Sequence, residues 1–411
     1  MIVKVAPHPL SGKVAAVKSK SYAHRYLIAA ALSGGRVTFG DSDDARYTAH
    51  ALASMGFEAT FDGESVKYGA FLPSEEVRSV FVGESGSTLR FLLPLAAALG
   101  VNADFVTAGR LGERPMAALT ECLSAHGVTA KAHSVRGKLS AGVYEIDATI
   151  SSQFVTGLLF ALPLLVGNSE IRLVGRAVSA PYINISLEVL AKAGVEIERT
   201  GKGYLIAGKQ AYRLKDAVVP GDFSGASFPL VAGALGEGVS VSGLDLSTAQ
   251  GDKAILDLIE KAGGVVKVSE GEVIVKKGAL RAFTAEVGET PDLAPILAVL
   301  AAFAAGESRL EKVARLRDKE SDRLAAIEEM LCAAGVSFRE EGDALVLAGG
   351  SPYGGAFDSK SDHRMAMSAA ILAAFARGES TVNDMTCVKK SYPRFWEDFA
   401  QLGGKYEVEG R

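Results

Sequence analysis

The chain has 411 residues, 48% of them hydrophobic, which is enough to bury large cores and to divide into about two domains. Its formal net charge is −4, so a nucleic-acid-binding surface is not expected. No apolar segment has the length and uniformity of a membrane span, so we expect no membrane partner either.

The cysteines and the start of the chain bear on the compartment. Cys122, Cys332 and Cys387 are scattered, with no pair at metal-ligand spacing, which is typical of a reducing environment. Residues 1–5 read as a strand, so we expect no signal or transit peptide. We therefore expect a cytoplasmic protein.

A unit of two helices, a glycine and a β-hairpin recurs six times along the chain. Glycine after an apolar periodic run is the usual helix stop, because it can adopt a positive φ. The glycines that end the second helices are spaced by 71, 67, 69, 72 and 68 residues. They are Gly56, Gly127, Gly194, Gly263, Gly335 and Gly403. The sixth copy ends in a single strand. A fixed period of this length indicates a repeat architecture.

The first helix of each unit is apolar on nearly every face, which predicts a buried helix. These helices are expected at 26–32, 91–99, 154–166, 228–235, 293–305 and 365–376. The second helices, such as those expected at 187–193 and 255–262, alternate charged and apolar residues at helical spacing. They are expected to form a half-exposed outer layer.

Cationic side chains gather where these helices begin. A helix N-terminus offers free N–H groups and the positive end of its dipole, so a nearby cation is unfavourable unless an anion lies between them. A solvated charge explains any one of these residues, but not their repeated placement. The cations are Lys20, Arg25, Arg90, Arg114, Lys319, Arg323, Arg364 and Lys390. The pattern predicts a site for one or two ligands that carry several negative groups.

Two carboxylates could supply proton chemistry. Asp292 stands between a proline and a long apolar helix, and Glu320 stands among charged neighbours. Each is either a salt-bridge partner or a general acid or base, and the residues alone leave both interpretations open. Ser151, Asp222 and Asp252 are interpreted as ordinary helix N-caps.

The chain resembles the 5-enolpyruvylshikimate-3-phosphate (EPSP) synthase family of enolpyruvyl transferases, from Lys20 to Lys390. Ten short motifs occur in the family's order. They are Lys20-Ser21-x-x-x-Arg25, Asp41-Ser-Asp-Asp44, Gly86-Ser-x-x-Arg90, Glu113-Arg-Pro115, Ser151-Ser-Gln-Phe154, Ser179-x-Pro-Tyr182, Gln250-Gly-Asp252, Pro291-Asp292, Lys319-Glu-x-Asp-Arg323 and Asp362-His-Arg-Met-Ala366. Each motif is weak alone, but all ten in order are highly specific.

The resemblance implies an α/β fold of two domains, each an inside-out α/β barrel built from three copies of a βαβαββ unit. One domain is expected to be discontinuous, comprising residues 1–17 and 221–411, and the other to span 18–220. The helix N-termini are expected to point into an active site in the cleft between the domains.

The implied reaction transfers the enolpyruvyl group of phosphoenolpyruvate to the 5-hydroxyl of shikimate 3-phosphate and releases phosphate, on the route to chorismate and the aromatic amino acids. No metal or cofactor is implied, and a monomer is expected. The family is the target of glyphosate, a phosphonate that occupies the phosphoenolpyruvate position. Gly86, at the start of a buried helix, is expected to border that position.

The resemblance also implies residue roles. Ser21 and Arg25 should hold the shikimate carboxylate; Ser151, Ser152, Ser179 and Lys319 its phosphate; and Tyr182 its ring. Lys20, Arg114, Gln153 and Lys390 should bind the transferring phosphate, and Arg323 and Arg364 the pyruvyl carboxylate. Asp292 should accept the hydroxyl proton, and Glu320 should protonate the methylene carbon, with Lys20 or Lys390 assisting.

Two alternatives are weighed against this function. The sister activity, UDP-N-acetylglucosamine enolpyruvyl transferase, typically carries a reactive cysteine on the loop at 111–114, where this chain has none. A non-catalytic polyanion-binding paralogue would be expected to lose Asp292, Glu320 or Lys20, and all three are present. The chain departs from the family's usual pattern at Glu84, Phe91 and Arg315. Lys390 is preferred to Lys389 as the catalytic lysine because it keeps the spacing to Tyr392.

Overall fold

The computed structural model describes residues 1–175, 178–269 and 271–409. The chain divides into two compact units. The N-terminal unit comprises Lys18–Val219, and the C-terminal unit comprises Met1–Val17 together with Pro220–Arg411. The chain therefore passes between the units twice, once near Val17 and once near Val219.

The N-terminal unit holds three repeats. Its buried first helices are α1 (Lys20–Ser33), α3 (Gly86–Leu99) and α5 (Ser152–Ala161), and its second helices are α2 (Asp43–Ser54), α4 (Ala117–Ser124) and α6 (Ala180–Lys192). Its strands are β3 (Arg36–Thr38), β4 (Phe57–Asp62), β5 (Ser65–Phe71), β6 (Arg78–Gly83), β7 (Ala103–Thr107), β8 (Val128–Lys131), β9 (Ser134–Gly137), β10 (Val143–Asp147), β11 (Ser169–Val174), β12 (Ile197–Thr200), β13 (Gly203–Ile206) and β14 (Asp216–Val218).

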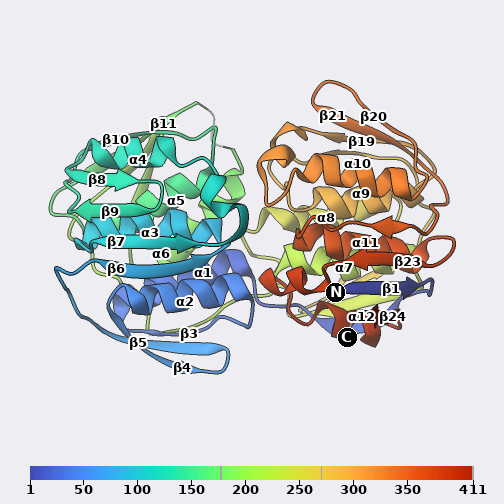
Figure 1. Ribbon diagram of the computed structural model, residues 1–411, viewed down its shortest axis with the longest axis horizontal. Coiled ribbons are helices and arrows are strands. Elements are labelled where there is room, and N and C mark those ends of the chain that lie inside the picture. The colour runs from blue at the N-terminus through green and yellow to red at the C-terminus, as the bar shows by residue number, and fades with distance from the viewer. Residues whose placement is uncertain (176–177, 270, 410–411) are drawn as a thin grey trace. The chain divides into compact units, whose positions relative to one another are not determined.

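The C-terminal unit repeats the pattern (Figure 1). Its first helices are α7 (Phe223–Leu235), α9 (Ala294–Phe303) and α11 (His363–Phe375), and its second helices are α8 (Ile255–Lys261), α10 (Arg323–Ala333) and α12 (Phe395–Gln401). Its strands are β1 (Ile2–Ala6), β2 (Ser11–Ala15), β15 (Gly238–Ser242), β16 (Val265–Ser269), β17 (Glu272–Lys276), β18 (Thr284–Glu286), β19 (Gly306–Glu311), β20 (Phe338–Glu340), β21 (Ala344–Gly349), β22 (Ala356–Phe357), β23 (Ser380–Asn383) and β24 (Lys405–Glu409).

The described strands form six four-stranded sheets, and none of these closes into a barrel. Each sheet joins a parallel pair to an antiparallel pair, as in the order β6-β7-β9-β8. In that sheet β6 and β7 run parallel with Val80 beside Phe105, and β8 and β9 run antiparallel with Ala130 beside Val135. Five of the antiparallel pairs are hairpins, and the sixth joins β1 to β24. A parallel pair needs a crossover connection. In four of the six sheets a buried first helix provides it (α3, α5, α9 or α11), whereas the pairs β3–β14 and β2–β15 join strands that lie far apart in the chain.

Three strands belong to sheets far from their sequence neighbours. β14 pairs in parallel with β3 and completes the first repeat, while β2 pairs in parallel with β15 and completes the fourth. β1 lies between β23 and β24, antiparallel to both, with Val3 beside Val382 and Val408. It therefore supplies the strand that the sixth repeat lacks, and Figure 1 shows it in blue next to the red chain end.

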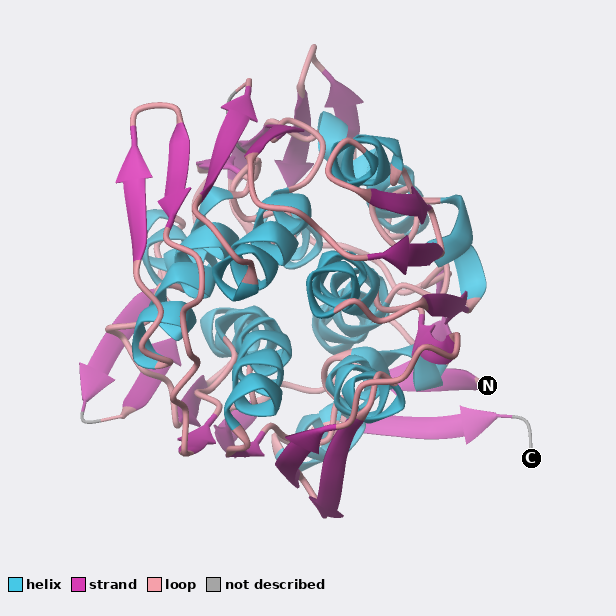
Figure 2. Ribbon diagram, turned by 90° about the vertical axis from the view of Figure 1, so that its left-hand side faces the viewer, coloured by secondary structure: helices cyan, strands magenta, loops and turns pink. Residues whose placement is uncertain are grey.

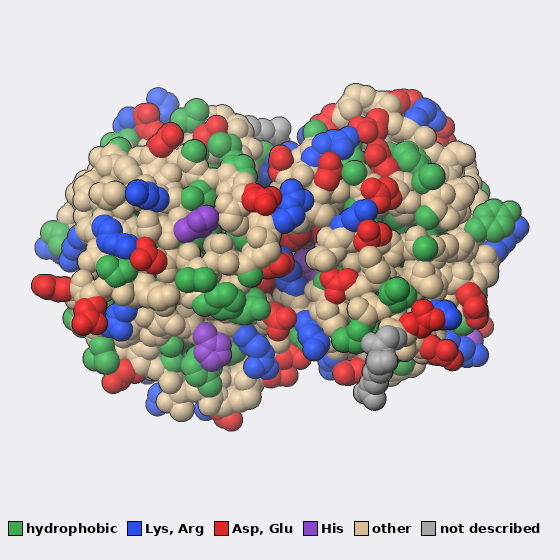
Figure 3. Space-filling model, viewed as in Figure 1, with side chains coloured by type: hydrophobic (Ala, Val, Ile, Leu, Met, Phe, Trp, Pro, Cys, Tyr) green, Lys and Arg blue, Asp and Glu red, His purple; other side chains and the backbone are tan. Residues whose placement is uncertain are grey.

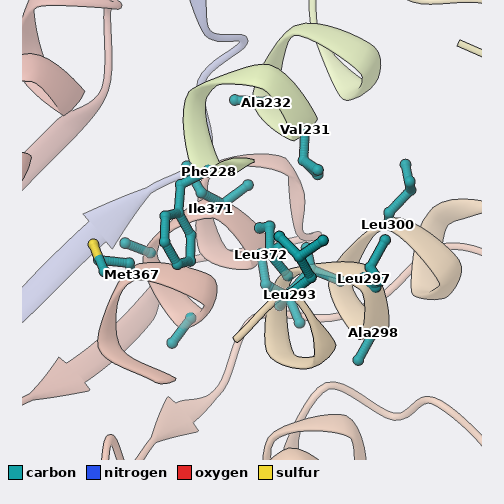
Figure 4. Close-up of a cluster of buried hydrophobic side chains, with 14 of the residues drawn as sticks. Phe228, Val231, Ala232, Leu293, Leu297, Ala298, Leu300, Met367, Ile371 and Leu372 are labelled. Atoms are coloured by element: carbon teal, nitrogen blue, oxygen red, sulfur yellow. The ribbon is translucent and has the colours of Figure 1, made fainter. Parts of the chain in front are cut away.

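The helices gather at the centre of each unit and the strands lie around them (Figure 2). In the C-terminal unit, α7, α9 and α11 pack through side chains such as Phe228, Leu297 and Ile371, all fully or almost fully buried (Figure 4). The expectation that α5 runs to residue 166 is wrong. The helix ends at Ala161, and a 3₁₀ turn follows over Leu162–Leu164, because a proline at 163 cannot continue the hydrogen-bond ladder.

On the surface, positive and negative side chains are interspersed over the face drawn in Figure 3, in keeping with a net charge near zero. Among the described helices, none combines the length and the apolarity needed to cross a membrane.

Candidate functional site

In the N-terminal unit, α1 and α2 begin side by side. Lys20 is the first residue of α1, and its Nζ lies 3.0 Å from Oδ2 of Asp44 in the first turn of α2. The lysine side chain is only 15% exposed. The carboxylate offsets the charge of a lysine at the unfavourable end of a helix dipole and fixes where its ammonium group lies.

Arg25, one turn further along α1, is a buried cation held by neutral groups. Its Nε donates to Oγ of Ser186 at 2.8 Å, and its Nη2 donates to the carbonyl of Tyr182 at 2.9 Å. Its Nη1 donates to the carbonyl of Ser21 at 2.5 Å, and its guanidinium lies over the ring of Phe91. Burial lowers the pKa of Arg25 to about 9. A buried guanidinium among neutral acceptors gains most from a nearby anion.

Gly86 opens α3 beside two guanidinium groups. A side chain at this position would place its Cβ 2.9 Å from Nη1 of Arg114 and 3.6 Å from Nη1 of Arg90. Arg90 donates to Oε1 of Gln153 at 2.7 Å, and Gln153 donates to Oγ of Ser87 at 3.0 Å. Nε of Arg114 is buried and has no hydrogen-bond partner among the described residues. These side chains form a polar, cationic corner where α3 and α5 begin.

The predicted serines lie at the starts of α5 and α6. Ser151 is the N-cap of α5 and accepts from the backbone N–H of Gln153 at 3.2 Å, so capping is confirmed there. Ser152 is buried in the first turn. Ser179 precedes α6 with φ at 53°, a strained conformation for serine, and Tyr182 follows in the first turn of that helix. Strain of this kind is common at functional sites.

In the C-terminal unit, Arg323 begins α10 and is fully buried. It donates to Oδ2 of Asp362 at 2.9 Å, to Oδ1 of Asp292 at 2.9 Å and to Oε2 of Glu320 at 2.7 Å. The three carboxylates outweigh the effect of burial and raise the pKa of Arg323 above its usual range. Arg323 thus joins the starts of α9, α10 and α11 into one network.

Arg364, in the first turn of α11, is also buried but differently bonded. Its Nη2 lies 3.3 Å from Oδ2 of Asp292. Its Nε and Nη1 have no hydrogen-bond partner among the described residues. Buried N–H groups are normally paired, so these unmatched donors indicate a place for an acceptor. Arg323 and Arg364 are both predicted to bind the pyruvyl carboxylate. Of the two, Arg364 is therefore the arginine whose N–H groups are available to a ligand.

Asp292 and Lys319 lie in the same electrostatic network. Burial would raise the pKa of Asp292, but Arg364, Arg323 and Lys319 hold it well below its usual range. Burial lowers the pKa of Lys319 to about 8, although Asp292 opposes the shift. Glu320, 19% exposed, is ion-paired with Arg323, so it is a salt-bridge partner in this structure.

Lys390 ends the 3₁₀ turn Met385–Lys390 and is partly buried, whereas Lys389 is exposed. The next aromatic, Tyr392, is buried and donates to Oδ2 of Asp398 at 2.7 Å, which anchors the segment. His363 is buried beside Asp362, with Nδ1 at 3.7 Å from Oδ1. The burial pattern favours Lys390 as the lysine that serves the site.

Some members of these networks had no role assigned from the sequence. Arg90, Asp44 and Asp362 all stand in the resembling motifs, so the motifs could have pointed to all three. The interpretation of Asp252 as an N-cap is wrong. It lies in the 3₁₀ turn Gly251–Ala254, where Oδ2 accepts a hydrogen bond from Ser224, whereas Asp222 does cap α7 by accepting from the N–H of Gly225 at 3.1 Å.

Comparison with known proteins places the chain in a family. A family model described as EPSP synthase (3-phosphoshikimate 1-carboxyvinyltransferase) matches residues 5–399. A 3-phosphoshikimate 1-carboxyvinyltransferase of Clostridium kluyveri is 38% identical over 418 residues, covering 98% of both chains. One of Clostridium novyi is 36% identical and covers 98% of this chain and 97% of its own.

Solved structures share the fold. An EPSP synthase of Acinetobacter baumannii superposes with a TM-score of 0.81 at 23% identity, covering 99% of this chain and all of its own. The enolpyruvyl transferase NikO of Streptomyces tendae superposes with a TM-score of 0.78 at 19% identity, covering 99% and 98%. Together with the full-length sequence matches, these findings show that the chain belongs to the EPSP synthase (3-phosphoshikimate 1-carboxyvinyltransferase) family.

Proposed function

We propose that this chain transfers the enolpyruvyl group of phosphoenolpyruvate to the 5-hydroxyl of shikimate 3-phosphate and releases phosphate. The observation that carries the proposal is the unmatched pair of N–H groups on buried Arg364, next to Asp292, the carboxylate that the resemblance implies as the proton acceptor. Both substrates are small polyanions, which suits a site lined by cations that the protein only partly neutralises.

The N-terminal unit offers groups for the shikimate ring and for a phosphate. Arg25 and Ser21 are proposed to hold the ring carboxylate, because Arg25 is buried among neutral acceptors. Tyr182 is proposed to contact the ring. The serines at the starts of α5 and α6 are proposed to bind the 3-phosphate: Ser151, Ser152 and Ser179. Lys20, Gly86, Arg114 and Gln153 are proposed to border the phosphate that leaves.

The C-terminal unit offers groups for the pyruvyl carboxylate and for proton transfer. Arg364 and Arg323 are proposed to bind the carboxylate, with Arg364 as the first contact, and Lys319 the 3-phosphate. Asp292 is ionised in the free protein because both arginines face it. When Arg364 binds a substrate carboxylate, its positive charge stabilises ionised Asp292 less. The proton affinity of Asp292 therefore rises, which favours transfer of the hydroxyl proton to it.

The proposed chemistry is addition followed by elimination. The 5-oxygen bonds to C2 of phosphoenolpyruvate as its proton passes to Asp292 and Glu320 delivers a proton to C3. Glu320 then takes a proton back from C3 of the tetrahedral intermediate, the C2–O bond to phosphate breaks, and the C2–C3 double bond forms. Lys20 and Lys390 are proposed to offset the charge of the leaving phosphate.

We also propose that the chain works as a cytoplasmic monomer. The proposed residues divide between the two units of one chain, so a second copy is not needed to complete the set. Free thiols at Cys122, Cys332 and Cys387 are typical of a reducing compartment.

A turnover assay tests the proposal. Phosphate should be released only when shikimate 3-phosphate and phosphoenolpyruvate are both present, with the enolpyruvyl ether as the second product. Release with UDP-N-acetylglucosamine instead would indicate the sister activity. Saturable binding of both substrates without release would indicate a polyanion-binding paralogue. Light scattering during turnover would report the oligomeric state.

A further inference from the structure

A buried carboxyl group that the proposed mechanism does not use acts electrostatically on Arg364. Asp252 is 3% exposed, and its Oδ2 accepts a hydrogen bond from Oγ of Ser224 in the first turn of α7. Its Oδ1 is buried without a hydrogen-bond partner among the described residues. An ionised carboxylate in this position would be poorly solvated, since only one of its two oxygens is bonded.

Three carboxyl groups act on the single guanidinium of Arg364. They are Asp222, the N-cap of α7; Asp252, from the turn before α8; and Asp292, before α9. If all three were ionised, three negative charges would act on Arg364, while the other cation that acts on it, Arg323, is itself bonded to three carboxylates. Such a surplus would repel any anion that approached the unmatched Nε and Nη1 of Arg364.

The neighbours divide these carboxyl groups into different charge states. Arg364 and Arg323 keep Asp292 ionised, and Asp222 accepts a hydrogen bond from the N–H of Gly225. Asp252 has neither an arginine hydrogen bond nor a backbone N–H donor among the described residues. Burial, followed by the nearby Asp292 charge, raises the pKa of Asp252 to about 7. Two carboxyls whose environments push their proton affinities apart are typical of working sites.

We propose that Asp252 is a positioning residue that stays protonated in the active enzyme, so that Arg364 keeps enough positive potential to bind the carboxylate of phosphoenolpyruvate. Ser224 fixes the orientation of the acid through its hydrogen bond. Asp252 itself touches no substrate in this role. When it ionises, the added negative charge weakens the hold of Arg364 on the anion. The inference deepens the proposed function and rests on it.

The isosteric variant Asp252→Asn tests this role, because an amide is neutral at every pH and still accepts from Ser224. In the parent enzyme, KM for phosphoenolpyruvate should rise as the pH passes from about 7 to 8.5, by at most about tenfold per pH unit for one ionisation. In Asp252→Asn the part of this rise that begins near pH 7 should be absent, which leaves only a rise at higher pH, where Lys319, with a pKa of about 8, loses its proton. The kcat near pH 6.5 should stay within about twofold of the parent. Asp257→Asn, an exposed carboxylate on α8, is the matched control and should keep the parental pH profile.

Ser224→Ala is a second, independent test, which still applies if Asp252→Asn folds poorly. The Ser224 hydrogen bond favours the ionised form, so removing it should move the rise in KM to higher pH. A purely structural contact would change stability but leave the position of that rise unchanged. An unaltered profile in both variants would overturn the inference. Absence of turnover by the parent enzyme would instead overturn the proposed function.

Discussion

At the scale of single residues, Gly86 limits what can occupy the cationic corner at the start of α3. A methyl group there would lie 2.9 Å from Nη1 of Arg114, so the guanidinium must shift by a few tenths of an ångström. We expect Gly86→Ala to weaken glyphosate binding by about 1–3 kcal/mol, or about 5- to 150-fold, because crowding alters a close-fitting anion site. Inhibition constants and KM values measured in parallel would check this.

The same Gly86 variant should change KM for shikimate 3-phosphate much less, because the serines and Arg25 proposed for that ligand lie on other helices. Gly201→Ala is the control, since a Cβ at Gly201 meets nothing within 4 Å. Equal losses for both ligands would show that Gly86 does not border the phosphoenolpyruvate position.

Glu320 and Asp292 are the proposed proton carriers. Glu320→Gln and Asp292→Asn should each lower kcat by about 10²–10⁴, the usual share of general acid–base catalysis. Both variants should still bind shikimate 3-phosphate by calorimetry. Glu260→Gln, an exposed carboxylate on α8, should leave kcat unchanged. Near-parental kcat with a defect confined to KM would assign the two carboxylates to binding instead.

His24 should make the protein sensitive to acid. The ring is buried between α1 and α2, its Nδ1 lies 2.6 Å from Oγ1 of Thr48, and burial lowers the pKa of His24 to about 3. The folded state therefore prefers the neutral ring, and the stability this gives is present above about pH 6.5 and is lost as the pH falls toward 3. Asp44 opposes the shift, and Lys20 and Arg25 reinforce it.

The prediction for His24→Asn follows from that sign. Between about pH 6 and pH 4, the free energy of unfolding of the parent should fall by about 1.4 kcal/mol per pH unit more than that of the variant. Denaturant unfolding at a series of pH values measures the difference. If the two proteins gave parallel curves of unfolding free energy against pH, protonation of His24 would not destabilise the folded state.

At the scale of helices, Gly157 sets the distance between α3 and α5. A Cβ at this residue would lie 2.4 Å from the carbonyl oxygen of Arg90 and 2.7 Å from Cγ of Pro94. We expect Gly157→Ala to separate the helices, to destabilise the fold by about 1–3 kcal/mol and to lower kcat/KM by stretching the bond between Arg90 and Gln153. A destabilised variant with unaltered kcat/KM would show that the helix spacing does not matter to the site.

Local signals in the sequence identify the repeats and the starts of the helices. The apolar first helices can be predicted from neighbouring residues alone, and so can the glycine that ends each second helix. Pro163 is also a local signal, and it could have corrected the predicted end of α5. The interior bonding could not be read in this way. Arg323 and Arg364 look alike in sequence, yet only the fold shows that three carboxylates surround the first and that the second keeps unmatched N–H groups. Likewise, Ser224 meets Asp252 only because α7 packs beside the following turn.

At the scale of the whole molecule, the N-terminal strands belong to the C-terminal unit. Deleting residues 2–15 removes β1 and β2. One sheet of that unit then lacks its inner strand β1, and another lacks its edge strand β2. We expect the deletion to unfold the C-terminal unit and abolish turnover. Limited proteolysis should still yield a resistant fragment close to Lys18–Val219, whose sheets are built from its own strands. Full protease resistance of the deleted chain would contradict this dependence.

The position of β1 also constrains how the polypeptide folds during translation. Its partners are β23 and β24, and Val3 lies beside Val408 near the other end of the chain. Once β1 has left the ribosome, it must therefore wait until β23 and β24 have been synthesised. Throughout that interval the nascent chain carries unpaired strands with exposed edges, which are open to pairing with other chains. The N-terminal unit, whose strands are all made in between, can fold meanwhile. We therefore expect yield on expression to depend on how chaperones protect the first fifteen or so residues.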